Sequence, residues 1–74
     1  MSFTSGIVAK YLRSAGFDAT VKSKATKRSS GMVETDKFIV VVYPTEMTVV
    51  LNRHCEMSRG MTELHQILDF VTPR

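Results

Sequence analysis

The sequence has few of the residues that stabilise small proteins through cross-links or metal ions. Cys55 is the only cysteine among 74 residues, so a disulfide within the chain is excluded and a zinc site built on paired cysteines lacks ligands. Only four glycines and two prolines are present, which argues against global disorder. No apolar run approaches the ~20 residues of a membrane-spanning helix, and the amino end lacks the segments of a signal peptide. We expect one cytoplasmic domain over residues 1–74, with no membrane contact.

Motifs for catalysis, nucleotide binding and metal binding are also missing. Neither glycine-rich phosphate-binding pattern, G-x-G-x-x-G or G-x-x-x-x-G-K, occurs. The seven Asp and Glu residues are scattered, so paired-carboxylate hydrolysis has no support. His54, Cys55, Glu56 and His65 could bind a divalent metal or activate a thiolate, but the spacings C-x-x-C and H-x-x-x-H are absent. We therefore expect no enzymatic activity, no cofactor and no metal site.

Two segments have the apolar periodicity of helices. Apolar residues at positions 7–15 fall on one stripe, with Thr4 or Ser5 placed to cap the start of the helix. Gly16 is placed to follow the last turn in the left-handed conformation. A second stripe predicts a helix over residues 61–71.

The sequence between these helices predicts three strands, at residues 17–25, 34–43 and 47–51. A mobile hairpin tip at residues 26–31 joins the first two, Pro44 lies in the next turn, and residues 52–59 form a polar connection. The second strand is apolar on both faces after Lys37, so we expect it to be central. The fold class is α+β: a single small domain of order α-β-β-β-α, with a three-stranded antiparallel meander and two helices packed on one face.

In this arrangement the positions that face the helices share one core, expected to contain Leu12, Val21, Val49, Leu51, Leu64 and Leu68. The opposite face stays partly uncovered and carries Thr20, Lys22, Lys24, Thr48 and Val50 beside one side of the second strand. Lysines mixed with exposed valines favour a docking surface, because large uncovered apolar patches are uncommon on monomers. A homodimer contact, or a face that simply tolerates these residues, is an equal alternative.

The basic residues are the remaining indication of function in the sequence, and the chain has a net charge of +3. The candidate binding residues are Lys22, Lys24, Lys27 and Arg28 on the first strand and hairpin tip, with Lys10 and Arg13 on the preceding helix. Such a cluster raises the local positive potential and can pair with phosphates or with an acidic protein face. The alternative is that the lysines protect an edge strand from aggregation. Aromatic residues, which stack on bases in single-strand binders, do not interleave the cluster.

The predicted order of elements is similar in topology to that of double-stranded RNA-binding domains and of the small ribonuclease toxins of toxin-antitoxin pairs. The final helix of those RNA-binding domains begins with a lysine-rich motif, whereas residues 60–63 here read Gly-Met-Thr-Glu. The toxins carry a histidine in the strand region, where residues 25–30 here contain none. Neither family is assigned. The layout and size also resemble those of small phage proteins that bind and block host machinery.

From these features we predict a small non-enzymatic binding module, an accessory protein or a phage-type inhibitor. It would dock on an acidic protein surface or a nucleoprotein complex through its basic strand and open sheet face. The alternative is a nucleic-acid-binding domain that contacts phosphates through the same basic residues. A homodimer remains compatible with either interpretation.

Overall fold

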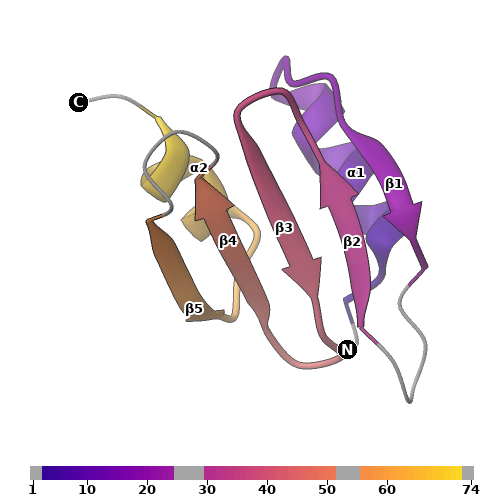
Figure 1. Cartoon of the computed structure of the whole chain (residues 1–74), viewed down its shortest axis with the longest axis vertical. Coiled ribbons are helices and arrows are strands. Elements are labelled where there is room, and N and C mark those ends of the chain that lie inside the picture. The colour runs from indigo at the N-terminus through magenta and orange to yellow at the C-terminus, as the bar shows by residue number, and fades with distance from the viewer. Residues whose placement is uncertain (1–2, 25–29, 52–55, 73–74) are drawn as a thin grey trace.

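The computed structural model describes residues 3–24, 30–51 and 56–72, and shows an α+β protein with two helices and a five-stranded antiparallel sheet (Figure 1). In chain order the elements are α1 (Ser5–Ser14), β1 (Thr20–Ser23), β2 (Gly31–Glu34), β3 (Phe38–Val42), β4 (Met47–Leu51), β5 (Met57–Met61) and α2 (His65–Val71). The strands lie in the sheet in the order of the chain, so each one pairs with its sequence neighbour. The predicted three-stranded meander is therefore wrong in its number of strands.

One correction concerns the predicted strand at residues 34–43, because its start forms a tight turn between two strands. Before this turn, β2 occupies Gly31–Glu34 and so includes the end of the predicted hairpin tip. Thr35 makes this turn: its N–H donates to the Phe38 carbonyl at 2.9 Å, and its hydroxyl accepts from the Phe38 N–H at 3.1 Å and the Lys37 N–H at 3.2 Å. The same hydroxyl lies 3.1 Å from the Phe38 carbonyl, to which it can donate. Serine and threonine hydroxyls often replace backbone partners in this way, and no glycine or proline is then needed to mark the turn.

A second correction concerns the predicted polar connection at residues 52–59, because its last part belongs to β5. This strand pairs with β4 at the edge of the sheet, and only Met61 of its residues is buried. Polar residues suit an edge strand, where water can reach both the backbone and the outer face. Consequently the last helix begins at His65, later than expected, and Gln66 Oε1 accepts from the backbone N–H groups of Thr62 and Glu63 before it.

The first helix follows the sequence prediction closely. The Thr4 side chain caps its start by accepting from the Ile7 N–H at 3.2 Å. Gly16 follows the last turn with a φ of 95°, a conformation that side chains with a Cβ rarely adopt. The local signals for a helix boundary are complete at both ends, which explains the agreement.

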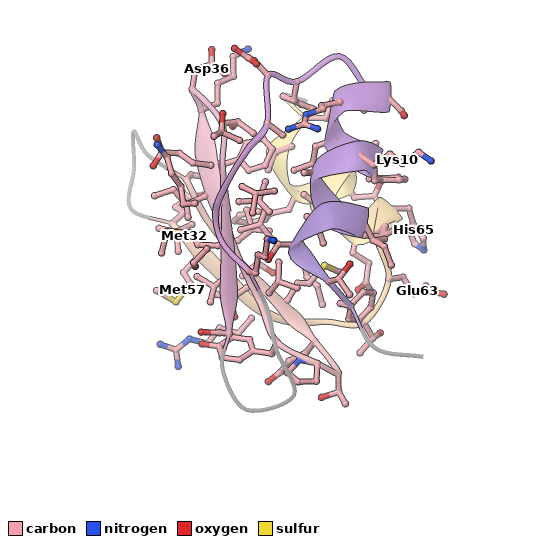
Figure 2. All side chains as sticks on the ribbon, turned by 90° about the vertical axis from the view of Figure 1, so that its right-hand side faces the viewer. Lys10, Met32, Asp36, Met57, Glu63 and His65 are labelled. Atoms are coloured by element: carbon pink, nitrogen blue, oxygen red, sulfur yellow. The ribbon has the colours of Figure 1, made fainter. Side chains whose placement is uncertain are left out.

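Both helices cover the same face of the sheet (Figure 2). Figure 1 shows α1 behind β1 and β2, and α2 behind β4 and β5. The centre of the covered face is a cross-strand row in which Val33 pairs with Val40 and Val40 with Val49, all fully buried. Other buried core residues come from the sheet, from both helices and from the segment before β1: Val8, Ala9, Leu12, Ala19, Phe38, Val42, Met47, Met61 and Ile67.

All six residues predicted for the core belong to it or pack against it, but they are buried to different extents. Leu12 and Val49 are fully buried, whereas Val21, Leu51, Leu64 and Leu68 are partly buried and pack against the core. Phe38, which follows the Thr35 turn, is buried and meets Phe17 edge-on with ring centroids 5.1 Å apart. The turn therefore positions the largest fully buried side chain among the described residues.

We predict that Thr35→Val lowers the free energy of unfolding by about 1 to 3 kcal/mol, because the buried N–H of Phe38 loses its acceptor while the side-chain shape is kept. Thr35→Ser retains the hydroxyl and serves as the matched control. Urea denaturation followed by circular dichroism measures both variants. If the valine variant were as stable as the serine variant, the hydroxyl would not hold the turn.

Candidate functional site

The sheet face opposite the helices is the largest functional candidate, and we call it the open sheet face. Because side chains alternate along a strand, the neighbours of the buried valine row point to this side. Figure 2 shows Met32 and Met57 on the side of the sheet away from both helices. By strand register, the open sheet face consists of Thr20, Lys22, Met32, Glu34, Ile39, Val41, Thr48, Val50, Met57 and Arg59.

Apolar side chains form a continuous band across the middle of the open sheet face. Ile39 is paired with Val50, and Val50 with Met57, so three neighbouring strands contribute to one row. Met32 and Val41 form a second pair beside it. Most of these side chains are half-buried by their neighbours, and Met57 is 49% exposed. No described element lies over this band.

Charged residues border the apolar band at both edges of the sheet. On β1, Lys22 Nζ lies 4.0 Å from Glu34 Oε1, and both side chains are about half exposed, so the pair contributes little to stability. On β5, Arg59 Nε lies 3.0 Å from Met57 Sδ, which places the guanidinium beside the apolar band. Among the described residues, no carboxylate lies within 4.0 Å of the Arg59 guanidinium. The described border therefore has a lysine beside a glutamate on the β1 side and an arginine on the β5 side.

The predicted basic cluster is divided between the two sides of the molecule. Lys22 lies on the open sheet face, and Lys24 is exposed directly after β1. Lys10 lies on α1 and points away from the sheet (Figure 2). Arg13, also on α1, donates from Nε to the Ala19 carbonyl at 3.0 Å. Lys27 and Arg28, and the predicted mobility of the hairpin tip around them, lie outside the described residues.

The sequence interpretation found part of the open sheet face and missed its β5 side. Thr20, Lys22, Thr48 and Val50 lie where they were expected. Arg59 and Met57 are absent from the predicted face because the sequence predicts a polar connection over residues 52–59. Met57 and Arg59 share one face, but Met61 is buried on the other, so β5 has no sustained alternation of apolar residues.

His65 is the centre of a second polar group, on the helix side of the molecule (Figure 2). Its Nε2 lies 2.8 Å from Glu63 Oε2, and its Nδ1 lies 3.5 Å from Asp69 Oδ2. Each ring nitrogen thus has its own carboxylate, and the two do not converge on one point where an ion could bind. No group of three metal-ligating side chains is found in residues 3–24, 30–51 and 56–72. His54 and Cys55, which completed the predicted metal or thiolate cluster, lie outside these residues.

A shallow pocket of about 290 Å³ lies between β5 and α2. Its lining consists of Ser58, Arg59, Gly60, Met61, Gln66, Asp69 and Phe70. The α2 residues recur at the spacing of one helix face, and the β5 residues belong to the edge strand. The pocket lacks a histidine or a paired carboxylate, so its chemistry suits binding rather than bond cleavage.

Comparison of the chain with protein-family models, with curated proteins and with solved structures finds no match. In the described part of the chain, neither helix has the length and apolar character needed to cross a membrane. Functional inference therefore depends on the geometry of the open sheet face, the His65 group and the β5 edge.

We predict that the pKa of His65 lies above its usual value near 6.5, because hydrogen bonds to Glu63 and then to Asp69 favour the imidazolium. The protonated form is then stabilised more in the folded than in the unfolded state. The resulting contribution to stability is fully present below the unfolded pKa and is lost as pH rises through the folded pKa.

An NMR titration of the assigned His65 ring protons measures this pKa. Glu63→Gln should lower it, whereas Lys10→Gln, on the other helix, should leave it unchanged. A wild-type His65 that titrates at or below its usual value would show that the two carboxylates do not hold the ring in solution.

Proposed function

We propose that this protein is a small non-enzymatic binding module that docks on an acidic surface of a larger protein through its open sheet face. The observation that supports this most strongly is the uncovered apolar band with basic residues at both of its edges. Burial of such a band supplies affinity, and the charges at its border orient the partner and accelerate association. An accessory role or an inhibitory role of the phage type fits a module of this size and design.

The apolar band indicates where on the protein the partner would bind. Ile39, Val50 and Met57 lie in one cross-strand row, and both helices pack on the other side of the sheet. Their cross-strand neighbours bury these side chains only in part, so apolar surface remains for a partner to cover. Burying them against a partner would release water from a contiguous surface, at about 25 cal/mol per Å² of apolar area.

The charges at the border of the apolar band indicate the charge that the partner surface would carry. Glu34 is the only carboxylate that strand register places on the open sheet face, and Lys22 already lies beside it. Arg59 has no described carboxylate partner, and Lys24 is exposed next to β1. The excess charge of this side is therefore positive, which favours an acidic protein surface.

A nucleic-acid-binding domain is the second candidate, because the same lysines could contact phosphates. The apolar band distinguishes the two proposals. Phosphate backbones are bound mainly by Lys, Arg and polar groups, whereas Ile39, Val41 and Val50 offer a surface that another protein can bury. A homodimer through the open sheet face would explain the band, but it would bring the basic borders of two copies together.

The test is affinity capture from extract of the cells that contain the gene, before and after nuclease treatment, followed by titration of the captured component. We predict a protein that is retained after nuclease. A charge reversal at Lys22, Lys24, Lys27 and Arg28 should weaken its binding by at least about tenfold, chiefly through slower association. The variant should remain folded, since exposed substitutions usually change stability by only about 0.5 kcal/mol each.

Two further variants locate the interface. Val50→Glu places a charge in the apolar band and should also abolish binding, whereas the matched reversal Lys10→Glu on α1 should not. Loss of all captured material after nuclease, with a steep salt dependence, would favour the nucleic-acid interpretation. Unchanged affinity in the basic-residue variant and in Val50→Glu would falsify docking through the open sheet face.

A further inference from the structure

The two edges of the sheet differ in how their backbone groups are used. On the β1 side, α1 covers the edge: Ser5 Oγ donates to the Ser23 carbonyl at 2.9 Å, and Arg13 Nε donates to the Ala19 carbonyl at 3.0 Å. The register of β1 also shifts between Val21 and Ser23, which interrupts a regular ladder. Side-chain caps and register shifts of this kind make an edge a poor template for another strand.

The β5 side has a different arrangement, which follows from the hydrogen-bonding pattern of its ladder. Leu51 N–H donates to the Glu56 carbonyl at 2.8 Å, so these two residues form a hydrogen-bonded pair. In an antiparallel ladder such pairs alternate with pairs that are not hydrogen-bonded. The next pair, Val50 with Met57, is of the second kind, and the N–H and C=O of Met57 therefore point away from β4. No described residue donates to or accepts from these two groups.

The pocket between β5 and α2 lies beside this edge (Figure 1). Its apolar surface comes mainly from Phe70, because Met61 is only 5% exposed, and Gly60, which has a φ of 74°, contributes no side chain. A Cβ at Gly60 would lie 3.5 Å from Glu46 Oε2. Between Ser58 and Met61 the ladder contains one extra residue on β5, since Met47 and Val49 pair with Met61 and Ser58. This bulge interrupts the regular ladder where β5 borders the pocket.

We propose that the β5 edge binds an extended, acidic peptide segment of a partner protein, which adds a sixth strand to the sheet and inserts an apolar side chain into the pocket. Backbone groups of Met57 would supply main-chain hydrogen bonds, as in other proteins that bind peptides by strand addition. Arg59 carries the only charge of β5 and lacks a described carboxylate partner, so it selects an acidic side chain. This site uses the edge of the sheet and shares Met57 and Arg59 with the open sheet face, whereas Lys22 and Val50 lie outside it.

A second copy of this chain fits the β5 edge less well. β5 contains no acidic residue, so an antiparallel pair of two β5 strands would bring two Arg59 side chains close together without a counter-charge. An acidic peptide would supply the carboxylate for Arg59 that a second β5 lacks.

The test uses a displayed library of random nine-residue peptides, selected against the full-length protein. Enriched peptides should contain Asp or Glu together with an apolar residue, and a synthetic copy should shift the amide NMR signals of β5 and α2. Arg59→Glu should weaken its binding by about tenfold or more, and Arg59→Lys should restore most of it. Lys22→Glu, on the opposite edge, is the matched control and should have no effect on this peptide.

Methylation of single peptide nitrogens tests strand addition itself. Because an added strand directs alternate N–H groups toward its neighbour, methylation should abolish binding at every second position and be tolerated between them. Tolerance at all positions, signal changes confined to the open sheet face, or a β5-mediated dimer in sedimentation experiments would each overturn the proposal. Failure of this site leaves the open sheet face untouched, because the Lys22 and Val50 variants test that face separately.

Discussion

The cross-strand row of Val33, Val40 and Val49 is the constraint on which the rest of the structure depends. These residues lie at the centre of the covered sheet face, and each is fully buried. Since side chains alternate along a strand, slipping one strand by a single residue would exchange its buried and exposed sets. The valine row therefore fixes which residues form the open sheet face, in addition to stabilising the core.

The cover of the sheet is one-sided among the described residues. Both helices pack on one face of the five-stranded sheet, and α1 also closes the β1 edge through Ser5 and Arg13. The opposite face and the β5 edge have no such cover among the described residues. Both proposals arise from this asymmetry: one uses side chains of Ile39 and Val50, and the other uses the backbone of Met57.

Local signals decided how much of the fold could be predicted. The first helix was predictable because an apolar stripe lies between a Thr4 cap and Gly16. The turn at Thr35 was missed, since a buried hydroxyl replaces the glycine or proline that usually marks one. On the site, Lys22 and Val50 follow from alternation alone, whereas the β5 contribution does not, because an edge strand that is mostly solvent-exposed leaves little apolar pattern. Separation of Lys10 from Lys22 depends on tertiary packing and has no sequence signal.

Solvent accessibility of the methionine methyl groups tests the central claim, the register that creates the open sheet face. In methyl-labelled protein, a soluble paramagnetic agent broadens NMR signals in proportion to their exposure. The structure predicts strong broadening for Met57, clear broadening for Met32, and protection for Met47 and Met61, which are 0% and 5% exposed. Broadening of Met47 equal to or greater than that of Met57 would mean that the sheet presents the opposite face to water, and would contradict the account.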